Sequence, residues 1–288
     1  MLCNEGQNII LPKPGFSLYE TLASSKGIEC RFYDLIPEKQ WEADLTHLES
    51  LIDENTSCIL VNNPSNPCGS VYTKEHLLQI LAVAEKHALP VISDEIYAGM
   101  VFDGSVFYPM ASLSTNVPIL TCGGLAKRYL VPGWRVGWVF IHDVHHLFDE
   151  VRRGLVNLSQ LTLGANSLIQ AAIPDILAAP EAFHTSTLQQ LERNAMLSRD
   201  LLSGIPGIVP VAPQGAMYLM LEIQMEHFTF TDDLQFVERL AEEESVLCLP
   251  GQCFRCPKPF IRIVFSPPED KLREAYSRIR QFCERHFS

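Results

Sequence analysis

The strongest constraint on the fold is an alternation of short apolar runs with helical patterns. Four runs are rich in strand-forming residues: 58–61, 90–93, 117–121 and 135–141. Between the first two, residues 73–88 show a helical pattern in which Thr73 can cap the first turn and Leu77, Leu81 and Ala84 form one apolar stripe. Strands and helices joined by short links are typical of a parallel α/β sheet.

After about residue 150 the pattern becomes more helical. The expected elements of this part are a long amphipathic helix at 188–202, strands at 217–223 and 260–265, and a final helix at 269–286. We therefore predict an α/β fold with a mostly parallel central sheet flanked by helices. The predicted domains are a large one over residues 1–188 and a smaller α+β one over residues 189–288.

The composition excludes several classes of protein. Of the 288 residues, 47% are hydrophobic and 19% are charged, which is typical of a globular chain. The net charge of −12 argues against nucleic-acid binding, which needs a basic face. We find no run of about 18 apolar residues, so no membrane span is expected. The N-terminus also lacks the pattern of a signal peptide.

Nine cysteines, an odd number, are scattered through apolar stretches. This distribution favours reduced thiols in a cytoplasmic protein over a disulfide scaffold. Cys253 and Cys256 form a CxxC pair, but no second ligand pair follows at a spacing suited to zinc. His142, His145 and His146 likewise lack further ligands at a spacing suited to zinc. We therefore interpret them as a solvated turn and predict no metal site.

Polar side chains follow the first three predicted strands. They are Asn66, Asp94 and Lys127, and in a parallel sheet ligands collect beyond the carboxyl ends of the strands. Lys127 comes after two glycines, which let a backbone approach something closely. Arg262 lies within an apolar run, where an unpaired charge would be costly. Each residue alone has an ordinary structural explanation, as a turn former, a cap or a surface cation.

The order and spacing of four motifs are more specific than any single residue. NNPSNPCG, SDEIYAG, GGLAKRYLVPGWRVGW and the Arg of FIRIV together resemble the fold type I aminotransferases, which depend on pyridoxal 5′-phosphate (PLP). The resemblance runs through essentially the whole chain. NNPSNPCGSVYTKEHL, STNVPILTCGGLAKRYLVPGWRVGW and QGAMYLM are similar to the tyrosine aminotransferases in particular.

The resemblance implies a role for each residue of the motifs. Lys127 would hold PLP covalently and move the proton during catalysis, because an amine can act as nucleophile and as base. Asp94 would pair with the ring nitrogen of the cofactor and keep it protonated. The other implied roles are as follows: Tyr97 and Asn66 bond the ring 3-oxygen, Arg135 binds the phosphate, Phe16 stacks on the ring, and Arg262, with Asn66 beside it, binds the substrate carboxylate.

The chain also departs from the family pattern. Many relatives place Ser or Thr three residues before the lysine, where this chain has Gly124, and tyrosine aminotransferases share that glycine. Tyr129 replaces their usual Trp, and the loop GQCFRCPKP differs from the family pattern, so the resemblance does not fix the exact substrate preference.

The family also has a long N-terminal part before the position of Leu2, which supplies an arm, a strand, a helix and a phosphate-binding loop. These 288 residues contain no counterpart of it. We therefore expect weak PLP retention and little transaminase activity from these residues alone.

The resemblance implies transfer of the amino group of an aromatic L-amino acid, tyrosine first, to 2-oxoglutarate in a ping-pong mechanism. It also implies a homodimer. Two alternatives stay open at this point. One is another PLP reaction on the same fold, such as a β-elimination or a synthase reaction. The other is a non-catalytic chain that acts by association. An NAD enzyme is disfavoured, because no GxGxxG follows a strand.

Overall fold

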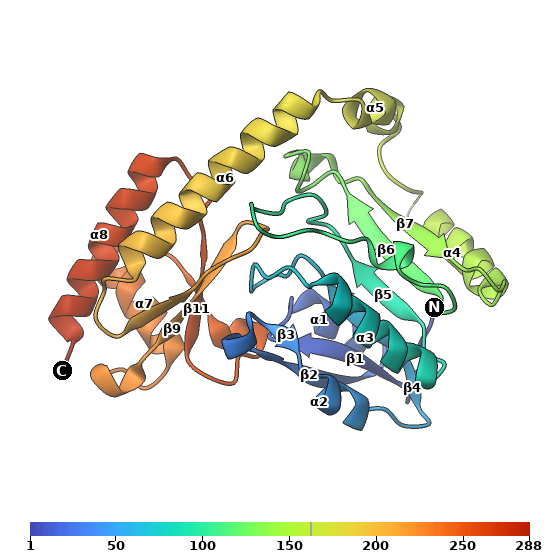
Figure 1. Cartoon of the computed structure of the whole chain (residues 1–288), viewed down its shortest axis with the longest axis horizontal. Helices are drawn as coiled ribbons and strands as arrows, with labels where there is room; N and C mark the ends of the chain where they lie inside the picture. The colour runs from blue at the N-terminus through green and yellow to red at the C-terminus, as the bar shows by residue number, and fades with distance from the viewer. Residues whose placement is uncertain (162) are drawn as a thin grey trace.

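A seven-stranded sheet forms the centre of the N-terminal part of the chain (Figure 1). The computed structural model describes residues 1–161 and 163–288. The strand order in this sheet is β3-β2-β1-β4-β5-β6-β7. The strands are β1 (Asn8–Lys13), β2 (Glu29–Ile36), β3 (Glu42–Ala43), β4 (Thr56–Asn62), β5 (Val91–Asp94), β6 (Ile119–Gly124) and β7 (Gly137–His142).

The sheet is mostly parallel, which confirms the predicted fold class. All pairs between β2 and β6 are parallel, and only the outer strands β3 and β7 run antiparallel to their neighbours. The predicted strands at 58–61, 90–93 and 117–121 correspond to β4, β5 and β6. The predicted start of the fourth strand, at residue 135, was wrong. Arg135 has a left-handed backbone, with φ at 55°, which cannot continue a strand, and β7 begins at Gly137.

Helices cover both faces of this sheet. They are α1 (Leu18–Ser24), α2 (Leu45–Ser50) and α3 (Lys74–Lys86), and two more helices follow β7, α4 (Asp149–Leu161) and α5 (Ser167–Leu177). The helix predicted at 73–88 is confirmed by α3, in which the Thr73 hydroxyl accepts a hydrogen bond from the backbone N–H of His76 at 3.1 Å. Leu77, Leu81 and Ala84 are buried as the apolar stripe requires.

The α3 stripe allows a test of packing with a matched control. Leu77 is fully buried, whereas its neighbour Leu78 is 41% exposed on the same helix. We expect Leu77→Ala to lower the free energy of unfolding by about 2–5 kcal/mol, because it leaves a cavity in the core. Leu78→Ala is expected to change it by about 0.5 kcal/mol or less. Urea denaturation of both variants measures the difference, and equal losses would contradict the assigned packing.

The C-terminal part contains a four-stranded antiparallel sheet in the order β10-β11-β9-β8. Its elements are α6 (Glu181–Leu202), β8 (Ile208–Val211), β9 (Tyr218–Ile223), α7 (Asp233–Glu244), β10 (Leu249–Pro250), β11 (Phe260–Val264) and α8 (Glu269–His286). The predicted helix at 188–202 begins earlier, at residue 181. It therefore runs through the boundary predicted after residue 188, and the division into 1–188 and 189–288 stays a prediction.

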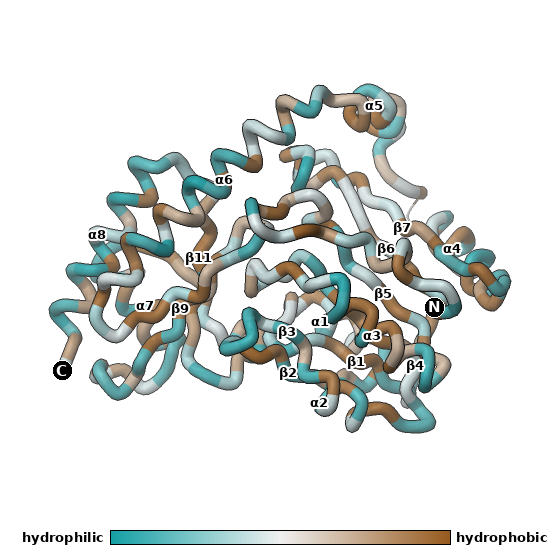
Figure 2. The backbone as a smooth tube through the Cα atoms, in the orientation of Figure 1, coloured by the Kyte–Doolittle hydropathy of each residue, from teal (hydrophilic) through white to brown (hydrophobic). Residues whose placement is uncertain are grey.

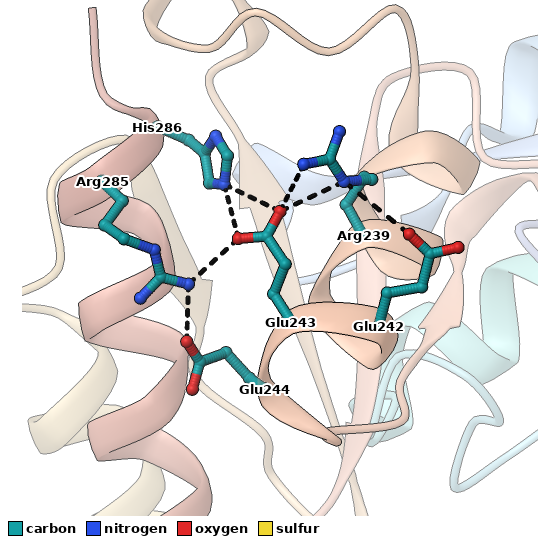
Figure 3. Close-up of polar contacts among 6 residues, drawn as sticks. All are labelled: Arg239, Glu242, Glu243, Glu244, Arg285 and His286. Carbon is teal, nitrogen blue, oxygen red and sulfur yellow. Dashed lines mark hydrogen bonds and ion pairs between the residues drawn. The ribbon is translucent and has the colours of Figure 1, made fainter.

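Charged side chains join α7 to α8 (Figure 3). The Glu243 carboxylate lies 2.9 Å from Nε2 of His286, 3.0 Å from Nη2 of Arg285 and 2.6 Å from Nη2 of Arg239. The hydrogen bond from His286, followed by those from the two arginines, lowers the pKa of Glu243 to about 2. The cluster therefore joins the last turn of α8 to the last turn of α7.

Apolar side chains remain exposed on the helices that follow β7. Within the described residues of α4 and α5 no side chain is fully buried, although both helices contain several leucines. Leu161, Leu168 and Leu177 are among the exposed ones, and Figure 2 shows the concentration of apolar residues in α5. Exposed apolar side chains on neighbouring turns of a helix are typical of an interaction face.

Candidate functional site

A cavity of about 370 Å³ lies at the carboxyl ends of the large-sheet strands, where the small sheet approaches them. The parallel register aligns Asn62 and Asp94, the last residues of β4 and β5, with Cys122 near the end of β6. Of the residues predicted from sequence, six line this cavity: Phe16, Asn66, Asp94, Tyr97, Lys127 and Arg262. The fold thus brings together residues that are up to 246 positions apart in the chain (262 − 16).

Asp94 is the last residue of β5 and is largely removed from water. Its Oδ2 accepts a hydrogen bond from the hydroxyl of Tyr19 at 2.5 Å, and its Oδ1 accepts one from the backbone N–H of Ile96 at 3.1 Å. Burial raises the pKa of the Asp94 carboxyl, against the opposing effects of these two hydrogen bonds and of the charge on Lys127. Within residues 1–161 and 163–288, no cationic side chain forms an ion pair with it. The carboxylate is therefore placed to receive a cationic N–H group.

Lys127 follows β6 in the loop that leads to β7. Its Nζ lies 5.4 Å from the centre of the Tyr97 ring. The two glycines before it are required by the close approach of β7, because a Cβ on Gly123 would lie 2.5 Å from Nε1 of Trp138 and one on Gly124 would lie 2.9 Å from the carbonyl oxygen of Val136. The Gly-Gly turn therefore brings the two strands together and directs the following loop toward the cavity.

Tyr97 is a buried residue of the cavity wall. Its hydroxyl is 2.7 Å from the hydroxyl of Tyr218, and the two rings meet edge to face. Burial, followed by the neighbouring Tyr218, raises the pKa of Tyr97. The phenol therefore stays neutral and available as a hydrogen-bond donor.

Arg262 is held between two aromatic rings. Its guanidinium carbon lies 4.4 Å from the centre of the Tyr218 ring and 4.7 Å from that of Phe254. Nη1 donates to Oδ1 of Asn66 at 2.7 Å, while the buried Nε has no partner. Burial lowers the pKa of Arg262. In the described part of the chain no carboxylate pairs with this cation, so it can accept a carboxylate from a ligand.

The last two predicted residues lie nearer to solvent. Phe16 is 36% exposed at the edge of the cavity, where its ring contacts that of Tyr19 edge to face at 5.5 Å. Arg135 is exposed and does not line the cavity. Its Nη1 donates to the carbonyl oxygen of Pro132 at 2.9 Å. The structure therefore brings six of the seven predicted residues together and leaves Arg135 outside.

Sequence reasoning missed four side chains of the cavity wall that carry a hydroxyl, amide or thiol group. They are Tyr19, Asn62, Cys122 and Tyr218. Tyr19 lies one helical turn after Phe16, and this spacing is the signal that could have identified it. Asn62 holds the loop that carries Asn66, because its Oδ1 accepts from the Asn66 backbone N–H at 2.7 Å. Tyr218 starts β9, and no local pattern marks its contact with Arg262.

The remaining sequence features have structural explanations. Over residues 1–161 and 163–288, no group of three or more His, Cys, Asp or Glu side chains is arranged to hold a metal ion. The expectation of a solvated turn was wrong for His142, which ends β7 half-buried and contacts the carbonyl oxygen of Ser114. His145 and His146 are exposed. In the same ranges we find no helix with the length and apolar character needed to cross a membrane.

Comparisons with known proteins agree with this geometry. The family model described as aminotransferase class I and II matches residues 1–279. The chain is 57% identical to tyrosine aminotransferase of Mus musculus over all of its own length and 64% of that protein, and 49% identical to tyrosine aminotransferase of Dictyostelium discoideum over 99% of its length and 70% of that protein.

The crystal structure of tyrosine aminotransferase from Leishmania infantum superposes with a TM-score of 0.95 at 40% identity, over 100% of this chain and 71% of that one. The chain thus spans about 64% of the length of its mouse relative. Because the match extends over nearly the whole chain in sequence and in fold, the chain belongs to the aminotransferase class I and II family.

Proposed function

We propose that this chain carries the catalytic centre of a PLP-dependent aminotransferase that moves the amino group of an aromatic L-amino acid, tyrosine first, to 2-oxoglutarate. The observation that supports this most is the content of the cavity. It holds one primary amine, one buried carboxylate without a cationic partner, and one guanidinium without a carboxylate partner. An amino acid and a pyridine cofactor together supply the missing partners of both charges.

These residues fit PLP because each has a group that can still bind part of the cofactor. Asp94 would pair with the ring nitrogen, Tyr97 and Asn66 would bond the ring 3-oxygen, and Phe16 would cover the ring face. Lys127 would attach the cofactor covalently. Arg135 lies outside the cavity with one hydrogen bond, to a backbone carbonyl, so its side chain would have to turn toward the cavity to bind the phosphate. When bound, PLP supplies an electron sink for the electrons left at the substrate Cα.

The side chains of this chain carry the other parts of the reaction. The Lys127 amine would move the proton at the substrate Cα, since a lysine can act as a general base once displaced from the cofactor. The Asp94 carboxylate would hold the proton of the ring nitrogen in place. Tyr19 would orient Asp94 through its hydroxyl, and the pair Tyr97 and Tyr218 would keep a phenol proton directed into the cavity.

The preference for an aromatic substrate has two supports. The cavity wall contains the rings of Phe16, Tyr19, Tyr97 and Tyr218, against which an aromatic side chain can pack. The relatives of highest identity given above are named tyrosine aminotransferases. The loop GQCFRCPKP forms a short 3-10 helix, Gly251–Phe254, that places Phe254 against Arg262.

Product stoichiometry tests the proposal independently of rate. Purified chain is incubated with PLP, tyrosine and 2-oxoglutarate, and the aryl oxo acid, glutamate and ammonia are quantified. Transamination predicts equal amounts of the oxo acid and glutamate. Ammonia without glutamate would mean elimination, and the absence of any product with full cofactor occupancy would mean a non-catalytic chain. Long incubation is part of the design, so that slow turnover is also detected.

Arg262→Lys is expected to raise the KM of both tyrosine and 2-oxoglutarate by roughly 10- to 100-fold, because lysine keeps the charge but loses the paired donors. Both substrates present the same carboxylate, so the two constants should rise together. Arg273→Lys is the matched control, since Arg273 is exposed on α8 and pairs only with Glu269. Unchanged Michaelis constants for both substrates would remove Arg262 from the site.

We also propose that a second copy of the chain covers the exposed apolar faces of α4 and α5, as a homodimer would require. Sedimentation velocity of the purified protein tests this, and a monomer at micromolar concentration would contradict it. A reducing compartment such as the cytoplasm is proposed as well, and the nine free thiols support it.

A further inference from the structure

Two cysteines face each other far from the cavity, on the side of the large sheet covered by α1. Sγ of Cys3 lies 3.7 Å from Sγ of Cys58. Cys58 is fully buried in β4, and Cys3 is half-buried just before β1. A disulfide has an S–S distance of about 2.0 Å, so each sulfur needs to move by less than about 1 Å.

The position of Cys3 is fixed by its surroundings. The next residues form a turn in which the backbone N–H of Gln7 donates to the carbonyl oxygen of Asn4, while the Gln7 side chain accepts from the N–H of Asn4. Leu2 and Cys3 pack on the apolar cluster that contains Cys58 and Ile9. The two thiols are therefore held next to each other by a turn and by core packing.

The two sulfurs differ in reactivity. The hydrogen bond from the Cys58 thiol lowers the pKa of Cys3, against the effect of partial burial, which favours the thiolate of Cys3. The same contact and deep burial raise the pKa of Cys58. Cys3 is thus the nucleophile that solvent can reach, and Cys58 is a thiol placed behind it.

From this geometry we propose that Cys3 and Cys58 are an oxidation site, at which a peroxide converts the two thiols into a reversible disulfide. The Cys3 sulfur attacks a peroxide oxygen, the O–O bond breaks, and the leaving oxygen departs as water or an alcohol after it gains a proton. The Cys58 sulfur then attacks the resulting sulfenic acid. The S–S bond forms, the S–O bond breaks, and water leaves with the Cys58 proton. An external dithiol reverses the reaction.

A third cysteine nearby defines the competing outcome. Cys30 of β2 and Cys58 of β4 both pair with Ile9, from opposite sides of β1. They are therefore two strand spacings apart, roughly 9.6 Å, which is too far for a disulfide. Cys30 can compete only for Cys3, and burial raises the pKa of Cys30. The structure therefore favours Cys58 as the partner.

Mapping of the oxidised protein tests this pairing. Reduced protein is treated with one equivalent of hydrogen peroxide, the remaining thiols are alkylated, and tryptic peptides are analysed by mass. We expect peptide 1–26 linked to peptide 40–74, with fragmentation assigning the link to Cys58 rather than Cys68. The expected mass loss is that of two hydrogens, and dithiothreitol should restore both thiols. A link from Cys3 to Cys30 would overturn the proposal.

Variants separate the roles of the two sulfurs. Cys3→Ser should abolish the link, and Cys253→Ser, at an exposed cysteine in a different part of the chain, should leave its yield unchanged. Cys58→Ala should let a sulfenic acid accumulate on Cys3, where dimedone traps it. If Cys58→Ala fails to fold, the alkylation rate of the wild-type protein decides: Cys3 modified no faster than Cys253 at neutral pH would refute the proposal.

Discussion

Lys127→Ala is expected to lower turnover by roughly 10⁴-fold, because the substitution removes both the covalent attachment of the cofactor and the group that moves the proton. Borohydride reduction of the wild-type chain with PLP should leave a pyridoxyl group on Lys127, and peptide mass mapping locates it. The variant should give no stable label. Its fold should be unaffected, since the Lys127 side chain borders a cavity and not the core.

Lys86→Ala is the matched control for this experiment. Lys86 is an exposed lysine at the end of α3 that pairs with Glu49, and its loss should leave labelling and turnover unchanged. A pyridoxyl group found mainly on Lys86 or on any other lysine would end the assignment of Lys127.

Asp94→Asn is expected to reduce turnover by roughly 10²- to 10³-fold while changing covalent cofactor loading far less. Loading needs the Lys127 amine, whereas turnover needs a protonated ring nitrogen, and a neutral amide cannot hold that proton. Asparagine keeps one of the two oxygens, so it can still accept from the Ile96 N–H, while its amide nitrogen takes the place of the oxygen that accepts from Tyr19. Equal losses of loading and turnover would contradict this role.

The same variant has a second effect, on the stability of the protein without cofactor. Burial raises the folded-state pKa of Asp94 above its unfolded value, so ionisation of this group opposes folding at neutral pH. We therefore expect Asp94→Asn to raise the urea midpoint at pH 7. The gain should shrink as the pH falls through the folded-state pKa and should vanish below about 3.9, where both states are protonated. A variant less stable at pH 7 would show that Asp94 is paired in a way not seen here.

Local sequence patterns were sufficient to predict the elements that bury one face. The α3 stripe, with Thr73 as its cap, and the final helix at 269–286 were predicted with their bounds nearly correct, because periodicity and capping act within a few residues. The ends of β4 and β5 were predicted to within one residue because polar residues follow their apolar runs, whereas β6 continues to Gly124, beyond the predicted end at residue 121. β1 was not predicted, because Pro12 and Pro14 interrupt the strand pattern at the end of its apolar run. The strands that pair with β1 are also distant in sequence.

The sequence by itself determined the order of the motifs, the chemical type of each candidate side chain and the family. The tertiary structure decided which charges lack partners. Arg262 meets Asn66 across 196 residues, and Tyr19 meets Asp94 across 75. Burial and pairing of this kind depend on contacts between distant segments, which no local pattern records. These contacts make Asp94 and Arg262 available to a ligand, whereas residues such as Arg31 and Asp53 pair with each other near the surface.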